Sequence, residues 1–302
     1  MMNIEEKYSY GEWQNCIKME NKEIELICTT DVGPRIVWFS LRGNQNMFKE
    51  FKQEQGKTGG QQWRSYGGHR LWHSPEAKPR TYYPDNETVD YEIENQKVRL
   101  IQNTEPTTGM QKQMEITFLG QNQVRVVHRI TNHNLWDIRF APWSITVMNT
   151  GGRAIIPQEP FVDWEERLTP VRPIALWGYT DMSDSRWLWG KKYIQLKQDP
   201  QKRTKQKLGV LNTLGWMAYV LGKQVFVKKY DYRPDNMYPD FGVNNEFYTD
   251  SDILEMETLG SYESVAGEDY VEHTEYWHLF KAEIGTEEES IDKNLIPLLN
   301  RI

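Results

Sequence analysis

The stretch Met114-Glu-Ile-Thr-Phe-Leu-Gly-Gln-Asn-Gln-Val-Arg-Val-Val-His-Arg-Ile130 decides the fold. Two runs rich in β-branched and aromatic residues flank Gly120-Gln-Asn-Gln123, which has the composition of a tight turn. A second turn of this kind occurs at Leu221-Gly-Lys-Gln224. Short apolar runs bounded by Gly, Asn or Asp fill most of the chain, and no clean helical period occurs before its last residues. The sequence therefore predicts an all-β protein built from antiparallel strands.

The expected strands follow one another without a change in composition that would mark a linker. We predict them at Cys16–Glu20, Ile24–Thr29, Arg35–Leu41, Val98–Gln102, Met114–Leu119, Val124–Ile130, Ile138–Met148, Tyr193–Lys197, Trp216–Leu221, Val225–Lys229 and Tyr270–Phe280. Residues 1–302 are therefore expected to form one large sandwich domain. Near the end, Thr286 and Glu289 have the spacing of a capping box before a short helix, which Pro297 should end or kink.

Composition restricts the classes of partner. The 302 residues carry a net charge of −7, which argues against a nucleic-acid partner because such a partner requires a basic face. The 12 Trp and 16 Tyr suit a wide β core or a surface that stacks on sugar rings. No apolar segment has membrane-spanning length, and the N-terminus has no signal core. With only Cys16 and Cys28, a reducing, cytoplasmic location is the simpler interpretation, with a disulfide between them as the alternative.

The segment Ile253-Leu-Glu-Met-Glu-Thr-Leu259 carries the strongest chemical signal. On a strand, Glu255 and Glu257 share one face and lie roughly 6.5–7 Å apart. Two such carboxylates repel each other when buried, so one should have a raised pKa, as a general acid or base near neutral pH requires. The alternative is an ordinary amphipathic strand with both carboxylates in solvent.

A second cluster of reactive side chains lies at Tyr66-Gly-Gly-His-Arg-Leu-Trp-His-Ser-Pro-Glu76. The Gly pair permits a turn that would aim His69 and Arg70 into a cleft, where Arg70 binds hydroxyls or a carboxylate and Trp72 stacks on a ring. His69 and His73 have the spacing of a helical metal site, but the flanking Gly-Gly and Ser-Pro disfavour a helix, so no metal is expected. The alternative is a Gly-rich turn with a buried Trp.

Loops and isolated cations add weaker signals. Tyr82-Tyr-Pro-Asp85 and Tyr238-Pro-Asp240 each place an aromatic ring and a carboxylate on a loop, and the polar stretches Lys49–Gln62 and Asp231–Asn245 are positioned to form the rim of a site. Lys207 and Lys228 lie beside strands, where a solvated position is the default. No phosphate-binding glycine loop or Gly-x-Ser-x-Gly elbow occurs, so phosphoryl transfer and Ser or Cys nucleophilic catalysis have little support.

Taken in chain order, the motifs resemble the galactose mutarotase-like superfamily of β-supersandwich proteins, and within it the aldose 1-epimerase-like proteins. The resemblance spans roughly residues 13–280. Gly67-Gly-His-Arg70 resembles the family segment that bears a catalytic His and Arg. Gly242–Thr249 resembles the epimerase Gly-x-Gln-x-Tyr-Thr strand, and Glu257-Thr258 resembles the Glu-Thr-Gln whose Glu is the general base. Ala266-Gly-Glu268 and Glu275-Tyr-Trp277 are similar to the family's Pro-Gly-Glu turn and final strand.

One departure from the family concerns the general acid. Aldose epimerases carry this acid as a His in a Thr-Asn-His motif, and Thr131-Asn-His133 invites the same assignment. However, this segment is predicted as a turn that ends the strand at Ile130, whereas the epimerase His lies on the next strand. We therefore expect Trp143 to lie nearer the acid position, with Pro142 favouring an edge or a bulge there.

The resemblance implies an enzyme that opens and recloses a sugar ring by general acid–base catalysis, without a cofactor or metal. Glu257 would be the base, and His69 and Arg70 would protonate or polarise the ring oxygen. The residues expected to bind the sugar are Trp72, Glu76, Tyr83, Trp143, Lys207 and Glu246. The expected partner is a small sugar or uronic acid, with neither nucleic acid nor membrane involved. Two alternatives use the same scaffold: a non-catalytic carbohydrate-binding protein, and a glycoside hydrolase or polysaccharide lyase.

Overall fold

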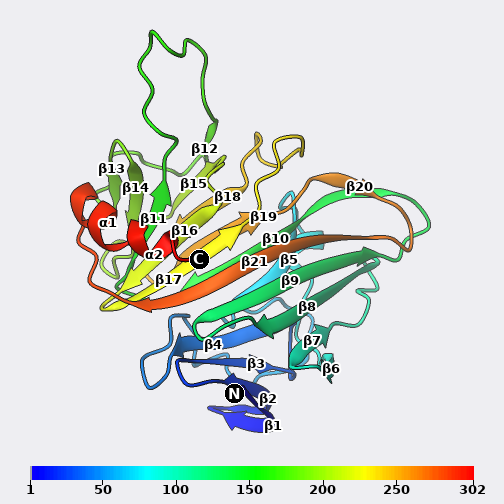
Figure 1. Cartoon of the computed structure of the whole chain (residues 1–302). Helices are drawn as coiled ribbons and strands as arrows, with labels where there is room; N and C mark the ends of the chain where they lie inside the picture. The colour runs from blue at the N-terminus through cyan, green and yellow to red at the C-terminus, as the bar shows by residue number, and fades with distance from the viewer. Residues whose placement is uncertain (1) are drawn as a thin grey trace.

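The computed structural model describes residues 2–302, and these form two large antiparallel sheets packed face to face (Figure 1). In spatial order, the first sheet consists of β1 (Asn3–Tyr10), β2 (Trp13–Glu20), β3 (Ile24–Thr29), β4 (Arg35–Leu41), β5 (His69–Ser74), β10 (Ile138–Met148), β19 (Leu254–Leu259), β18 (Asn245–Thr249), β15 (Gln206–Val210) and β12 (Ile174–Leu176), with β20 (Glu263–Val265) also paired to β10. The second consists of β13 (Trp187–Trp189), β14 (Tyr193–Lys197), β11 (Arg153–Pro157), β16 (Trp216–Leu221), β17 (Gln224–Tyr230), β21 (Tyr270–Lys281), β9 (Gln123–Asn132), β8 (Met110–Phe118), β7 (Lys97–Ile101) and β6 (Asp90–Glu94). The predicted all-β sandwich is confirmed.

The core lies between the inner faces of the two sheets. Alternate residues of β9 are buried, as expected for strands with one face on a core and one toward solvent. Phe39 of the first sheet packs against Trp277 of the second, with ring centroids 5.5 Å apart, and both are fully buried. Each buried aromatic ring of this size removes a large apolar area from water and stabilises the contact between the sheets.

The Gly-Gly motif starts a strand in the middle of the first sheet, between β4 and β10, so the expectation that it forms a turn bearing His69 and Arg70 was wrong. Gly67 and Gly68 have φ values of 82° and 69°, and a Cβ on Gly68 would lie 2.3 Å from the Ile36 carbonyl oxygen. Only glycine fits so close to a neighbouring backbone. Because β5 begins directly after this pair, His69 and Arg70 point to opposite faces of the sheet.

The C-terminal segment forms two short helices, α1 (Glu288–Asn294) and α2 (Ile296–Leu299), which cover the outer face of the second sheet near β16 and β17 (Figure 1). The predicted capping box is not formed, because Glu287 occupies the N-cap position and makes no side-chain bond to the helix. Pro297 lies in the first turn of α2, where its missing N–H costs nothing.

The two cysteines are free thiols, and both are buried. Cys16 pairs with Thr29, and Ile17 pairs with Cys28, so the two side chains point to opposite faces of the β2–β3 pair. Among residues 2–302, no helix combines the length and apolar character needed to cross a membrane.

Candidate functional site

The outer face of the first sheet carries the expected carboxylates. Register aligns Arg70, Ile145, Glu257 and Glu246 in one row across β5, β10, β19 and β18. Glu255 lies in the adjacent row, so it shares a face with Glu257, as the sequence predicted. This face forms a floor assembled from strands that lie far apart in the chain, and Glu257 is completely buried in it.

One lysine joins two carboxylates on this floor. The Nζ of Lys207 lies 2.7 Å from Oε2 of Glu246 and 3.2 Å from Oε2 of Glu257. All three residues are at most 4% exposed. The indole N–H of Trp143 donates to the same oxygen of Glu257 at 2.7 Å, and the Lys207 ammonium lies over the rings of Trp143 and Trp177, 4.8 and 4.7 Å from their centroids. The default expectation from the sequence, a solvated Lys207, was therefore wrong.

The protonation of this group differs between its members. Burial raises the pKa of the Glu246 carboxyl well above its usual range, although Lys207 opposes the shift. Burial acts to lower the pKa of Lys207, but the charges of Glu257 and Glu246 outweigh it and raise this pKa. Glu246 is therefore the carboxyl of this group whose protonated form burial favours, and Lys207 is its cation.

Two carboxylate oxygens on the floor have no hydrogen-bond partner. They are Oε1 of Glu246 and Oε1 of Glu257, and Nε of Arg70 is also unpaired. Each group is polar and buried, which carries a free-energy cost unless a ligand or water supplies a partner. The floor is therefore prepared for a polar ligand with both donors and acceptors.

Arg70 holds the neighbouring carboxylate. Its Nη2 lies 3.0 Å from Oε1 of Glu255, and its guanidinium stacks over the rings of Trp63 and Trp72. Burial raises the pKa of Glu255, while the charge of Arg70 opposes this shift. Because this cation is already paired, it orients Glu255 and has little free charge for an acidic ligand.

Aromatic rings form one wall above the floor. Trp72 contacts Trp63, Tyr82 and Trp143 edge to face, at centroid distances of 5.4, 4.9 and 5.5 Å. The cleft has a volume of about 300 Å³, which is at the small end for ligand pockets. Its lining residues are Glu76, Ala77, Lys78, Tyr82, Trp143, Trp177, Asp240 and Glu246. Trp72, Lys207 and Glu257 are not among them and lie directly behind this lining, where they contact Trp143 or Glu246.

The cleft uses Tyr82 rather than the predicted Tyr83. Tyr82 ends the short 3₁₀ helix η1 (Arg80–Tyr82), and its hydroxyl donates to Glu76. Tyr83 is absent from the lining residues, and burial followed by the charges of Glu105 and Glu87 raises its pKa. Two adjacent tyrosines in a loop cannot be distinguished by spacing, and the sequence contains no other signal that separates them.

The two long polar stretches contribute unequally to this cleft. Asp240, from the predicted rim Asp231–Asn245, lines it, and its carboxylate accepts a bond from Ser74 at 3.3 Å. No residue of Lys49–Gln62 is among the lining residues, although Trp63 directly after this stretch packs in the aromatic wall.

His69 lies on the inner face of the first sheet, fully buried and away from the carboxylates. Its Nδ1 lies 2.7 Å from the Thr146 hydroxyl and its Nε2 lies 2.7 Å from Nε2 of His128. Because Nδ1 of His128 must donate to the carbonyl of His273, we assign the shared proton to Nε2 of His69. Burial lowers the pKa of His69 well below its usual range, so it stays neutral. The structure does not bring it together with Glu257.

Lys228 and Glu275 form a buried ion pair beside these histidines. Their Nζ and Oε1 atoms lie 2.9 Å apart, and both side chains are fully buried, so the expected solvated position of Lys228 was wrong. His69, His128 and Glu275 are arranged closely enough to hold a metal ion, with their ligand atoms within 4.8 Å of one another. In this network, however, the Lys228 ammonium supplies the positive charge beside Glu275.

His133 lies apart from the cleft, as the strand pattern suggested. It follows the end of β9, and its Nδ1 contacts the exposed carboxylate of Glu268 at 2.8 Å. Trp143 instead faces Glu257 on the floor.

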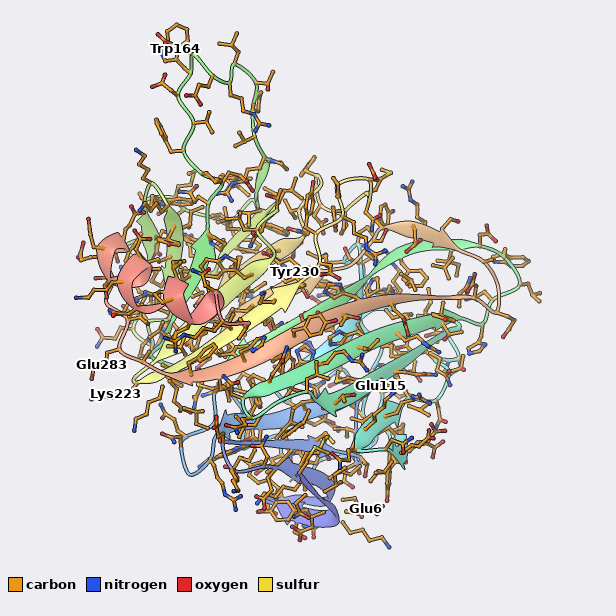
Figure 2. The ribbon with its side chains drawn as sticks, viewed as in Figure 1. Glu6, Glu115, Trp164, Lys223, Tyr230 and Glu283 are labelled. Carbon is orange, nitrogen blue, oxygen red and sulfur yellow. The ribbon has the colours of Figure 1, made fainter. Side chains whose placement is uncertain are left out.

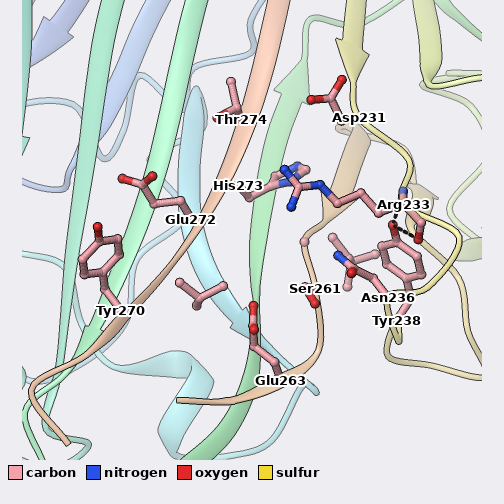
Figure 3. A pocket seen from close by; sticks show the side chains of 13 residues that line it. Asp231, Arg233, Asn236, Tyr238, Ser261, Glu263, Tyr270, Glu272, His273 and Thr274 are labelled. Atoms are coloured by element: carbon pink, nitrogen blue, oxygen red, sulfur yellow. Dashed lines mark hydrogen bonds between the residues drawn. The ribbon is translucent and has the colours of Figure 1, made fainter. Parts of the chain in front are cut away.

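A larger cavity, of about 400 Å³, lies between β21 and the loop that carries Arg233 and Tyr238 (Figure 3). It follows β21 from Tyr270 to Thr274, where β17 has already ended and leaves this edge unpaired. His273 lines it, and its Nε2 contacts the hydroxyl of Thr258 at 2.7 Å. Since this cavity contains a mixture of acidic and basic side chains and no buried carboxylate pair, we place the candidate site at the smaller cleft.

Comparison with known proteins bears on the fold. No protein-family model matches the sequence, and a search of curated proteins finds no match. Among solved structures, a putative mutarotase from Salmonella typhimurium superposes with a TM-score of 0.59 at 9% identity, over 93% of this chain and 97% of that one. A putative aldose 1-epimerase from Escherichia coli K12 superposes with a TM-score of 0.51 at 10% identity, over 93% and 100% of the two chains.

The chain has the galactose mutarotase-like fold. The resemblance seen in the sequence is thus confirmed at the level of the fold. A TPR-domain containing protein from Parabacteroides distasonis has the same arrangement in part of its length: this chain covers 48% of it, with a TM-score of 0.55 and 12% identity. Identities of this size carry no information about individual catalytic residues.

Proposed function

We propose that the cleft binds a pyranose sugar and interconverts its anomers, with Glu257 as general base and Glu246 as general acid. The observation that carries this proposal is the buried Glu246–Lys207–Glu257 group, in which each carboxyl keeps one unpaired oxygen. Two carboxyls held side by side around one cation, each with an oxygen available to a ligand, suit acid–base catalysis.

The reaction requires two proton transfers close to one carbon atom. The base takes the proton of the anomeric hydroxyl, the bond between the anomeric carbon and the ring oxygen breaks, and the acid protonates the ring oxygen. Rotation of the resulting aldehyde and the reverse steps give the other anomer. Because both oxygens are attached to the same carbon, acid and base can lie on neighbouring strands, as the paired residues Glu246 and Glu257 do. The ammonium of Lys207 stabilises Glu246 as a carboxylate after ring opening and Glu257 as a carboxylate after ring closure.

The remaining residues of the cleft suit the binding of a sugar. Trp72 and Trp143 present apolar ring surface beside the polar floor, and Glu76 and Asp240 supply acceptors for hydroxyl groups at the rim. Arg70 acts by positioning Glu255 rather than by protonating the ring oxygen, since its guanidinium is paired.

A non-catalytic sugar-binding protein is the second candidate. The observation that favours it is the indole N–H of Trp143, which donates to Glu257. The strand pattern of the sequence predicted Trp143 near the position of the general acid in the epimerases. The indole and the Lys207 ammonium together occupy Oε2 of Glu257, which leaves only Oε1 for a ligand.

Polarimetry or NMR of freshly dissolved pure anomers separates these functions. We expect wild type to exceed the uncatalysed rate for at least one aldose. Glu257→Gln and Glu246→Gln should each lower the rate by ~10²-fold or more, with sugar affinity changed little, because each keeps its volume but loses proton transfer. Tyr83→Phe, outside the cleft, is the control and should retain the full rate. Sugar binding without any catalysed interconversion would establish the binding protein instead.

A further inference from the structure

The floor of the cleft carries an excess of carboxyl groups. Glu255 is paired with Arg70, while Glu246 and Glu257 share the single ammonium of Lys207. Both cations of the floor are therefore already neutralised by residues of the chain itself. An anionic group on a ligand would meet no free positive charge there.

The rim of the cleft, formed by Glu76, Lys78 and Asp240, also has more carboxylates than cations. Glu76 and Asp240 line the cleft against one lysine, Lys78, whose ammonium lies 5.2 Å from the centre of the Tyr82 ring. If Glu246 holds a proton, the floor is neutral and the cleft still carries one net negative charge from the rim. If Glu246 is ionised, the excess is two. In both cases the net charge of the cleft is negative, and so is its electrostatic potential.

A second observation shows that this acidic group faces a ligand position. Glu246 lines the cleft, is 1% exposed, and has an Oε1 atom without a hydrogen-bond partner. Glu257, beside it, also has an unpaired Oε1. Surface acidic residues without a ligand are normally solvated, whereas these oxygens are shielded from bulk water.

From this charge pattern we infer that the cleft selects sugars by charge: a sugar with a primary ammonium group binds more tightly than its hydroxyl counterpart, and a uronic acid binds more weakly. The inference rests on the proposed function, because it places a sugar in this cleft. The ammonium group contacts Glu76 and Asp240 at the rim, and the anomeric end lies on the floor at Glu246 and Glu257. The uronic acid considered from the sequence is therefore the disfavoured ligand.

Calorimetry with matched sugars tests the inference. The probes are glucose, glucosamine and glucuronate, and the corresponding galactose series, at pH 6.5 so that the amine is protonated. We expect glucosamine to bind about 3–10-fold more tightly than glucose, and glucuronate to bind more weakly by a similar factor, as for partly solvated charge pairs. N-acetylglucosamine, which lacks the charge, should lose the advantage. Raising the salt concentration should narrow the differences.

Two rim variants form a matched pair for this test. Asp240→Asn removes one carboxylate but can still accept the bond from Ser74, so it should reduce the preference for glucosamine over glucose by about 3-fold. Lys78→Met removes the only rim cation among the lining residues and should increase the preference. Glucose affinity is measured for each variant as well, so that the preference is taken as a ratio within one protein.

The outcomes separate the two proposals. If glucose binds and the order by charge is absent or reversed, charge selection fails while the sugar site stands. If the order is present but unchanged in both variants, the assignment to the rim carboxylates fails. If none of the sugars binds, both the proposed function and this inference fail.

Discussion

Two donors meet one oxygen at Glu257. The Trp143 indole and the Lys207 ammonium both contact its Oε2, which fixes the carboxylate and leaves Oε1 unpaired. A buried carboxylate held in this way has one oxygen for structure and one for a ligand. Trp143 thus has two separable roles, a hydrogen bond to the base and an apolar surface for the sugar.

Replacing Trp143 by Phe separates these roles. Phe keeps much of the ring surface and removes the indole N–H, so Oε2 of Glu257 keeps only its contact with the Lys207 ammonium. We expect sugar affinity within about 3-fold of wild type and a changed rate of anomer interconversion, because the hydrogen bond to the base is lost while most of the ring surface remains. Trp143→Ala should instead weaken binding by ~1–3 kcal/mol. A Phe variant as weak in binding as the Ala variant would show that the indole N–H, rather than the ring, binds the sugar.

In β5, strand alternation places adjacent residues on opposite faces of the sheet and so gives them different roles. Arg70 and Trp72 face the cleft, while His69 and His73 face the core. His69 belongs to a polar layer between the sheets, in which Lys228, Ser144 and Thr258 all bond to the Glu275 carboxylate. Such a layer is satisfied only in one register of the two sheets, so it specifies their alignment.

Removing one partner of the buried pair should be costly. Lys228→Met leaves the Glu275 charge without its cation, and we expect the free energy of unfolding to fall by about 3–5 kcal/mol. The double variant Lys228→Met/Glu275→Gln removes both charges and should lose less than the sum of the single changes. Urea denaturation of the four proteins gives this comparison. Additive losses would contradict the coupling that the structure implies.

The predictable part of the site and the missed part differ for physical reasons. Glu255 and Glu257 were placed on one face because strand alternation depends only on sequence neighbours. The burial of Lys207 and Lys228 depends on strands paired from distant parts of the chain, which alternation does not specify. The Gly67-Gly68 motif was recognised, but its positive φ angles precede a strand instead of forming a turn in a loop. Tyr82 and Tyr83 differ only in the folded chain, where the 3₁₀ helix ends at Tyr82 and the Tyr82 hydroxyl bonds to Glu76.

At the scale of the whole molecule, acid should destabilise the protein. Burial lowers the pKa of five histidines: His73 and His273 to about 3, His128 and His278 to about 4, and His69 well below its usual range. As pH falls below about 6.5, the unfolded chain binds protons that these buried rings cannot, which costs up to about 1.4 kcal/mol per pH unit for each group.

The buried carboxyls with raised pKa act in the opposite direction over the same range. They are fewer, namely Glu50, Glu246 and Glu255. We therefore expect the free energy of unfolding to fall as the pH is lowered from 7 to 5, measured by the urea midpoint at each pH. Constant or increasing stability over this interval would mean that the histidines titrate in the folded protein.

The single-domain organisation expected for residues 1–302 has a direct test. The loop at residues 158–173, between β11 and β12, projects from the sandwich with Trp164 at its tip, 70% exposed (Figure 2). A protease should cut there first. Because segments on both sides of the cut pair within each of the two sheets, the fragments should remain associated and elute together under native conditions. Release of two separately folded halves would contradict a single domain.

The position of β21 determines the order in which the molecule can be completed during synthesis. It is the last strand in the chain, yet it lies inside the second sheet between β9 and β17. Until the ribosome has released it, both neighbours have open edges, and Glu275 is missing from the layer that aligns the sheets. The second sheet therefore cannot be completed until β21 has been synthesised. This predicts slow folding and a nascent chain that needs protection from aggregation.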